Sequence, residues 1–183
     1  MATDNSLTCA ISEEVQLAAH DPRWAEQFAA ERDRLQDFLP GQLAAIEHIG
    51  STAVSGLAAK PIIDILAGVD TISGADALLA PLCAHGYVTS AEFNATLSDR
   101  RWLMRHASGR RTHHLHLVVF GGERWVRWLQ FRDLLRADAA TATRYQHLKQ
   151  ELASQHRHDR EAYTRAKAAF INEVLSTPPD EHD

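Results

Sequence analysis

The sequence predicts an α+β fold whose C-terminal part is helical, and three observations support this prediction. Residues 62–69 form a nearly continuous apolar stretch, which is typical of a central β-strand buried on both faces. Ser108-Gly109 separates two strand-like segments, which indicates a β-hairpin. After residue 123, the pattern indicates three successive helices that end near residue 175.

The first predicted elements are a helix and a short strand. Asp21-Pro22 has the composition of a helix start, and Pro40-Gly41 ends the helical spacing of apolar residues that follows. Residues 44–49 then lead into Gly50-Ser51-Thr52, whose small residues favour a turn with accessible backbone amides.

The remaining elements follow in order along the chain. A second helix is expected at residues 74–84, before the hairpin strands at 101–106 and 112–120. Side chains alternate along a strand, so His114 and His116 are expected on one face. The C-terminal helices are expected at residues 123–137, 138–155 and 159–175, with Asp138 and Asp159 as N-caps.

Composition and charge indicate one ordinary soluble domain. The chain has 183 residues, of which 45% are hydrophobic and 23% charged, which suffices to bury one core. We expect a single domain over residues 1–183, with a core at about 15–174 and flexible ends. The 24 acidic residues outnumber the 19 basic ones, which argues against general nucleic-acid binding.

A cytoplasmic location without a membrane partner is expected. No apolar run approaches the roughly 18 residues that span a bilayer, and residues 1–8 lack a signal-peptide pattern. Cys9 and Cys83 lie far apart, which argues against a disulfide framework and a thiolate zinc site. P-loop, Rossmann and GxSxG motifs do not occur.

The turn Gly50-Ser51-Thr52 and the strand residue Asp64 predict a site for phosphate and metal. Turn amides and a serine hydroxyl hold phosphate oxygens, and a carboxylate on the next strand holds the divalent ion that phosphates need. A buried carboxylate requires compensation in any case. The alternative is that Asp64 pairs with Lys60, an arginine or a neighbouring loop.

His114 and His116 have a spacing that lets two imidazoles meet one metal ion. His48 is expected to supply a third nitrogen, so that the predicted metal ligands are His48, Asp64, His114 and His116. The alternative is that these histidines only hydrogen-bond a backbone carbonyl or a carboxylate.

Basic side chains recur at three- or four-residue intervals on the C-terminal helices, where they are expected to form a phosphate funnel. The alternative is that they lie on solvated faces and pair with neighbouring acidic residues such as Asp133 and Glu161. The residues concerned are Arg132, Arg136, Lys149, Arg160 and Lys167, and Tyr145 and Tyr163 share the faces of Lys149 and Lys167.

Residues 46–65, IEHIGSTAVSGLAAKPIIDI, resemble the signature of the GrpB-like proteins, a branch of the nucleotidyltransferase superfamily with the DNA polymerase β-type palm. The resemblance extends over about residues 15–174 and implies a mixed β-sheet flanked by helices. It also implies that Gly50 and Ser51 hold nucleotide phosphates, that Lys60 stabilises their charge and that Asp64 binds metal. The chain departs from the superfamily at Leu66, where a second metal-binding carboxylate is usual.

The resemblance implies a nucleotidyltransferase-like enzyme that uses a nucleoside triphosphate such as ATP on a small-molecule acceptor. Asp64, His114 and His116 are the expected catalytic residues, and the divalent metal is Mg or a transition metal such as Mn or Zn. Two alternatives stay open. One is a non-catalytic nucleotide or coenzyme A binding module, since a related domain is fused to dephospho-coenzyme A kinase. The other is a metal-dependent enzyme of different chemistry. A homodimer is a further open alternative to a monomer.

Overall fold

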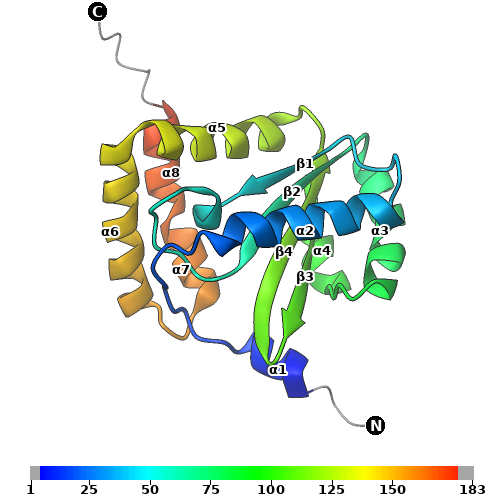
Figure 1. The fold of residues 1–183 in the computed structure, drawn as a ribbon, viewed down its shortest axis with the longest axis horizontal. Helices are drawn as coiled ribbons and strands as arrows, with labels where there is room; N and C mark the ends of the chain where they lie inside the picture. The colour runs from blue at the N-terminus through cyan, green and yellow to red at the C-terminus, as the bar shows by residue number, and fades with distance from the viewer. Residues whose placement is uncertain (1–4, 177–183) are drawn as a thin grey trace, which may run out of the picture.

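The computed structural model describes residues 5–176 and contains one four-stranded mixed sheet (Figure 1). Its strands lie in the order β1-β2-β4-β3. The central strand β2 pairs antiparallel with β1 and parallel with β4, and β3 forms an antiparallel hairpin with β4. The strand bounds are β1 Ala45–Ile49, β2 Ile63–Val69, β3 Arg100–Ala107 and β4 Arg110–Val119.

Helices cover both faces of this sheet and extend beyond one edge of it, as Figure 1 shows. A short 3-10 turn, η1 Ser51–Ala53, directly follows β1. The helix bounds are α1 Asn5–Ile11, α2 Arg23–Phe38, α3 Ile72–Ala84, α4 Ala91–Ala95, α5 Glu123–Ala137, α6 Ala139–Gln155, α7 Arg160–Ala166 and α8 Ala168–Ser176.

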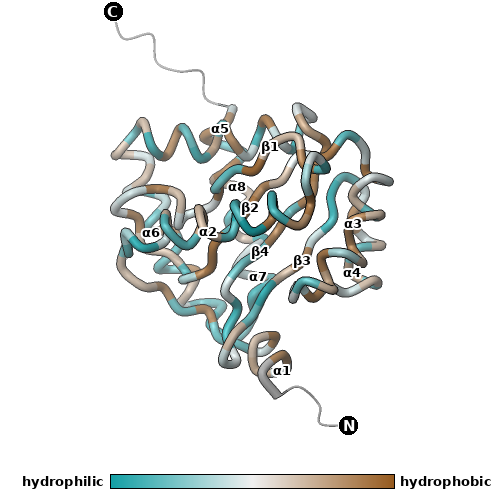
Figure 2. The backbone as a smooth tube through the Cα atoms, turned by 45° about the vertical axis from the view of Figure 1, so that its right-hand side comes forward, coloured by the Kyte–Doolittle hydropathy of each residue, from teal (hydrophilic) through white to brown (hydrophobic). Residues whose placement is uncertain are grey.

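The main hydrophobic core lies between the sheet and the helices α2 and α3. Ile65 of β2 and Leu115 of β4 are fully buried there against Leu35 of α2 and Leu82 of α3. Burying a side chain of this size stabilises the fold by about 1.5–3 kcal/mol. In Figure 2, where the tube is coloured by residue hydropathy, the largely hydrophobic strand β2 runs through the middle of the molecule.

A smaller core covers the opposite face of the sheet. Leu66 and Val118 pack there against Trp125 of α5, with Trp128 beside them. The helices α6 to α8 pack on α5, on each other and on the loop between β1 and β2. Tyr145 of α6, Leu57 of that loop and Leu135 of α5 belong to one hydrophobic cluster. This packing places α6 next to the turn that follows β1.

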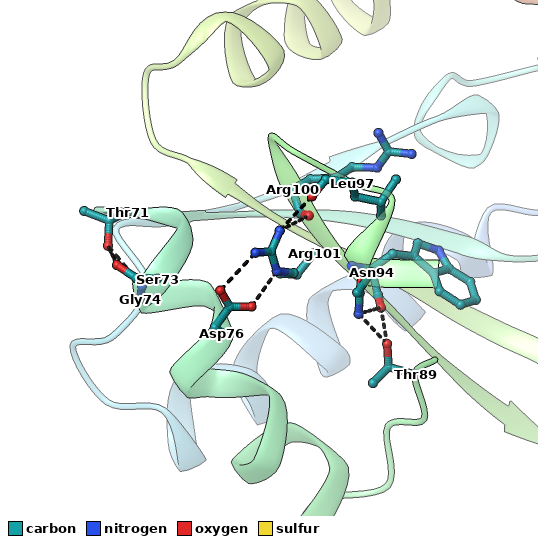
Figure 3. Close-up of polar contacts among 10 residues, drawn as sticks. Thr71, Ser73, Gly74, Asp76, Thr89, Asn94, Leu97, Arg100 and Arg101 are labelled. Carbon is teal, nitrogen blue, oxygen red and sulfur yellow. Dashed lines mark hydrogen bonds and ion pairs between the residues drawn. The ribbon is translucent and has the colours of Figure 1, made fainter. Parts of the chain in front are cut away.

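The outer strand β3 is tied to its neighbouring helices by polar contacts, which Figure 3 shows. Arg101 donates from Nε to Oδ1 of Asp76 in α3 at 2.5 Å. Asn94 of α4 is buried, accepts from the backbone N–H of Trp102 at 2.8 Å and donates to Oγ1 of Thr89 at 2.7 Å. These bonds satisfy backbone groups at the edge of the sheet.

The predicted α+β fold is confirmed, including the mixed sheet and the helical C-terminal part. Asp138 and Asp159 cap α6 and α7 as expected. Two helices, α1 and α4, were not predicted, and the expected helix at residues 159–175 is divided at Lys167. Arg111 donates to the carbonyl of Ala10 at 3.0 Å, so α1 is held on the hairpin.

The expected flexible ends lie in part outside the described residues, which exclude 1–4 and 177–183. No helix among residues 5–176 has the length and apolar character that a bilayer crossing requires.

Candidate metal and phosphate site

Asp64, His114 and His116 lie together on the sheet face that α5 covers. In the parallel pairing of β2 with β4, Asp64 is opposite His114 and Leu66 is opposite His116. Nδ1 of His114 lies 3.0 Å from Oδ1 of Asp64. Each of the three residues offers one ligand atom, and these atoms all lie within 4.8 Å of one another. The sequence-predicted pair of strand histidines and the strand carboxylate are thus brought together.

The three side chains have the protonation states that metal ligands need. Burial lowers the pKa of His116 to about 3 and also lowers the pKa of His114. Burial by itself raises the pKa of Asp64, but the hydrogen bond from His114 and the nearby positive charges outweigh it and lower this pKa to about 2. At neutral pH the site therefore has one carboxylate and two neutral imidazoles.

Two ring nitrogens of this cluster fit a bound metal ion. Nε2 of His114 and Nδ1 of His116 are buried, and neither has a hydrogen-bond partner among the described residues. A buried nitrogen without a partner is destabilising, and coordination by a metal ion removes that cost. A set of two imidazoles and one carboxylate favours Zn, Mn or Fe over Mg.

Gly50 brings the turn after β1 into direct contact with Asp64. Its backbone has φ +71° and ψ −172°, a conformation that is essentially restricted to glycine. A Cβ atom at this position would lie 2.5 Å from Oδ2 of Asp64. The turn can therefore approach the Asp64 carboxylate this closely only because Gly50 has no side chain.

Lys149 of α6 reaches the same turn. Its Nζ atom donates to Oγ of Ser51 at 3.0 Å and also to the carbonyl of Ala58. Lys149 is only 1% exposed, and burial followed by the charge of Lys167 lowers its pKa to about 7. The predicted residues Ser51 and Lys149, 98 positions apart, thus contact each other.

All three lysines of the chain, Lys60, Lys149 and Lys167, lie in this region. Nζ of Lys60 and Nζ of Lys167 lie 5.0 and 4.4 Å from the ring centre of Tyr163. Burial lowers the pKa of Lys60 to about 7 and that of Lys167 to about 8, and Asp64 partly opposes both shifts. Within residues 5–176, none of the three lysines forms an ion pair with an acidic side chain.

The predicted ligand His48 lies outside the metal cluster, and this prediction is wrong. Its register partner is Ile65, whereas Asp64 is opposite Ile49, so the His48 ring is on the α2 face of the sheet. There it stacks on Phe28 with 4.7 Å between ring centres.

Thr52, predicted to hold phosphate, shares the buried environment of His48. The Oγ1 atom of Thr52 lies 3.0 Å from Nε2 of His48 and donates to the carbonyl of Ile62 at 3.3 Å. Thr52 is 4% exposed, so its hydroxyl stabilises the turn and is not available to a phosphate.

Three of the predicted phosphate-binding arginines are engaged elsewhere. Arg132 donates to the neighbouring Asp133 at 2.7 Å, as the alternative predicted, and also to Glu47 at 2.7 Å. Arg160 donates to the distant Glu13 at 2.8 Å, which neither alternative predicted. Arg136 donates to the carbonyl of Ala53 at 2.9 Å and lines a separate open groove of about 710 Å³. Arg160 still borders the lysines, because its charge contributes to the lowered pKa of Lys60.

Tyr145 and Tyr163, which share the spacing of the predicted basic helix faces, line the site. Tyr163 lies beside two of the lysines, and the ring centre of Tyr145 is 5.0 Å from Nζ of Lys149. Their helical spacing from Lys149 and Lys167 predicts this arrangement, since residues four apart share a helix face.

The fold and this cluster define an α+β protein with a candidate metal site near three buried lysines. Comparison with known proteins identifies the family: the GrpB protein family matches residues 14–177, and this chain belongs to it. The chain is similar to the glutamate-rich protein GrpB of Alkalihalophilus pseudofirmus, with 33% identity over 171 residues that cover 89% of this chain and 95% of that protein.

Two further similarities concern fold and length. The crystal structure of the conserved protein GrpB from Enterococcus faecalis has a TM-score of 0.76 and 39% identity, covering 87% of this chain and 94% of that one. YqkA of Bacillus subtilis is 36% identical over 157 residues, which are 86% of this chain but only 45% of YqkA. The chain thus spans less than half the length of that relative.

A more distant similarity is to a dephospho-CoA kinase of Mycolicibacterium paratuberculosis. The identity is 29% over 184 residues, which cover 87% of this chain and 45% of that protein.

Proposed function

We propose that this protein is a metal-dependent, nucleotidyltransferase-like enzyme of the cytoplasm that uses a nucleoside triphosphate and acts on a small-molecule acceptor. The observation that carries the proposal is the position of Lys60 and Lys167 near Asp64, which belongs to a cluster that fits a metal ion, together with the contact of Lys149 with Ser51 in the adjoining turn. A triphosphate offsets the charge of the lysines, and its oxygens complete the ligand set of the metal.

Each group of the site has a distinct role in this proposal. The ionised Asp64 and the neutral rings of His114 and His116 hold the metal, which polarises phosphate oxygens when it is bound. Gly50 keeps the turn in contact with the Asp64 carboxylate, because no Cβ atom intervenes. The lysines stabilise the negative charge of the phosphates.

Binding of an anion restores the positive charge of the lysines. With a pKa of about 7, Lys60 and Lys149 are each partly neutral at pH 7. A phosphate group beside an amine favours the ammonium form, so binding is coupled to proton uptake. This proton uptake distinguishes binding at the lysines from binding at arginines, which stay charged throughout.

The second candidate function is a non-catalytic module that binds a nucleotide or coenzyme A. The similarity to a protein named dephospho-CoA kinase favours it, because coenzyme A also carries several phosphate groups. Leu66 favours it too, since it supplies no second carboxylate on β2. Both candidates use the same lysines and differ in whether the ligand is converted.

Metal content and ligand binding test the site. We expect purified, tag-free protein to bind about one Mn²⁺ or Zn²⁺ ion per chain by elemental analysis and titration calorimetry. His114→Ala abolishes this binding, whereas His147→Ala, which changes an exposed histidine of α6, retains it. Equal metal binding by these two variants would contradict the assigned cluster.

Thermal-shift measurements with ATP, coenzyme A and tripolyphosphate, each with and without Mn²⁺, then identify the ligand. We expect metal-dependent stabilisation by ATP that is lost in Asp64→Asn and retained in Asp70→Asn, which changes an exposed aspartate after the same strand. Mass spectrometry of ATP incubated with candidate acceptors distinguishes the two candidate functions. Pyrophosphate release supports the enzyme, and binding without product supports the module.

A further inference from the structure

The Ser51 hydroxyl and the Lys149 amine form a pair inside the site. Nζ of Lys149 lies 3.0 Å from Oγ of Ser51, and its second contact is with the carbonyl of Ala58. The amine is thus fixed at two points, one of which is the hydroxyl. Lys149 is 1% exposed, so its amine is shielded from water on most sides.

The surroundings of this pair lack an acidic partner for the amine. Among the described residues, Lys149 forms no ion pair, and the groups that face it are Ser51, the Tyr145 ring at 5.0 Å and the charged Lys167. An amine in such surroundings is able to accept a proton near neutral pH. A serine with a neighbouring lysine base is a known solution for nucleophilic catalysis.

Ser51 is also the accessible hydroxyl of the turn. It follows Gly50, whose positive φ ends β1, and it is the first residue of η1. Ser51 is half-buried, whereas the neighbouring Thr52 is buried and bonded to His48. The Gly50 contact with Asp64 places Ser51 next to the metal cluster.

We propose that Ser51 is a nucleophile, that Lys149 is its general base, and that Ser51 takes up the nucleotidyl group of the bound triphosphate in a covalent intermediate. The identity of this ligand rests on the proposed function, whereas the pair itself needs neither metal nor nucleotide to react with a phosphorus electrophile.

The reaction has two balanced steps. In the first, the bond between Oγ and the α-phosphorus forms while the bond from that phosphorus to pyrophosphate breaks, and the serine proton passes through Nζ of Lys149 to the leaving oxygen. In the second, an acceptor hydroxyl attacks the phosphorus, the bond to Oγ breaks, and the acceptor's proton returns through Lys149 to Ser51. No group is oxidised or reduced.

A fluorophosphonate probe tests the pair directly. Attack by Oγ on its phosphorus releases fluoride, and mass spectrometry of peptides locates the adduct. We expect one adduct on Ser51 in the unmodified chain and in Ser55→Ala, which changes an exposed serine of the same loop, and no adduct in Ser51→Ala. Absence of an adduct on Ser51 in the unmodified sequence would overturn the proposal.

The role of Lys149 needs a second comparison. We expect Lys149→Met to slow adduct formation by about 100-fold or more, because general-base assistance contributes about 10²–10⁴-fold. An unchanged rate in a folded variant overturns the assignment of Lys149. If Lys149→Met does not melt cooperatively, the thiols of Ser51→Cys and Ser55→Cys are compared in otherwise unchanged chains.

We expect iodoacetamide to alkylate the Ser51→Cys thiol at least about 10-fold faster at pH 7 than the more exposed Ser55→Cys thiol, since a neighbouring amine promotes the thiolate. Equal alkylation rates of the two thiols would overturn the proposal that Lys149 activates the group at position 51. Nucleotide binding without any adduct would contradict only the proposal that Ser51 is a nucleophile. An adduct without nucleotide binding would contradict only the proposal that the ligand is a nucleoside triphosphate. The two proposals therefore fail separately.

Discussion

Oδ2 of Asp64 lies 2.5 Å from the position that a Cβ atom would occupy on Gly50. The turn after β1 therefore contacts the carboxylate of β2 directly. The other oxygen, Oδ1, contacts His114 on the opposite neighbouring strand at 3.0 Å. Asp64 thus joins the turn that precedes Ser51 to the histidines of β4.

Substitution of Gly50 by alanine is expected to damage both the fold and the site. The backbone has φ +71° and ψ −172°, and a side chain in this region costs about 1–3 kcal/mol, to which the contact with Asp64 adds. We expect Gly50→Ala to lower the free energy of unfolding by about 2–3 kcal/mol. Metal affinity falls by about 10-fold or more, because Asp64 is displaced. Urea unfolding and metal titration measure the two effects.

Gly56→Ala is the matched control for this prediction. Gly56 also has a positive φ, +79°, but a Cβ atom there meets nothing within 4 Å. We expect a loss of about 1–2 kcal/mol from the backbone conformation alone, with metal affinity retained. The same loss of metal affinity in both variants would refute a specific contact between Gly50 and Asp64.

The three lysines predict an unusual dependence of stability on pH. In the unfolded chain their pKa is near 10.5, whereas in the folded chain it is about 7 for Lys60 and Lys149 and about 8 for Lys167. At pH values between the folded-state and unfolded-state pKa, the unfolded chain binds more protons than the folded chain. The free energy of unfolding therefore increases as pH rises through this range and decreases as pH falls towards 7. Lys60 or Lys149 alone corresponds to a rise of about 3 kcal/mol between pH 7 and pH 9.5, so we expect urea unfolding to show a rise of at least this size.

Tripolyphosphate provides the matching control for the lysine effect. Phosphate beside the amines raises their pKa, so a saturating concentration is expected to flatten the rise with pH. Lys60→Met removes one of the three groups and reduces the rise, whereas Arg144→Met, which changes an exposed residue paired with Glu173, leaves it unchanged. A stability that is flat or falls from pH 7 to pH 9.5 without ligand would show that the lysines keep their ordinary pKa.

His48 and His114 are expected to respond oppositely to replacement by alanine. His48 stacks on Phe28 and bonds Thr52 in a buried position, so His48→Ala lowers the free energy of unfolding by about 1–3 kcal/mol and leaves metal binding intact. His114→Ala removes metal binding. Urea unfolding of the metal-free proteins and calorimetric metal titration give both readouts, and loss of metal binding in His48→Ala would restore His48 as a ligand.

The position of His48 illustrates what the sequence could and could not predict. Alternation along one strand correctly put His114 and His116 on one face, because that pattern is local. Whether His48 shares the face of Asp64 depends on the register between β1 and β2, which pairs Ile49 with Asp64. Neither strand alone contains that information.

The basic residues of the C-terminal helices also show that a local pattern is predictable from sequence and that a distant partner is not. Their spacing correctly placed Lys149 and Tyr145 on one face of α6, since both lie in the site. It could not distinguish Lys149, which reaches Ser51, from Arg132, whose partner Glu47 lies 85 residues earlier. Partners so distant in sequence follow only from the packing of α5 and α6 beside β1.

Glu31 of α2 is the centre of a buried ion-pair network that the sequence did not suggest. It is 4% exposed, contacts Arg34 at 2.6 Å and Arg105 of β3 at 2.5 Å, and accepts a hydrogen bond from Tyr87 at 2.5 Å. The network thus connects α2 with the outer strand across the main core. Burial raises the pKa of Glu31, but its hydrogen bonds and the charge of Arg105 outweigh this effect, so the carboxylate stays ionised.

We expect Glu31→Gln to lower the free energy of unfolding by about 2–4 kcal/mol, because two arginines lose a buried carboxylate. Asp76→Asn breaks the ion pair of Arg101 with α3, but Asp76 is 48% exposed, so water replaces the lost contact and the change is at most about 1 kcal/mol. Urea unfolding at pH 7 compares the two. Since both ion pairs connect β3 to a helix, equal losses would mean that burial does not determine their contribution.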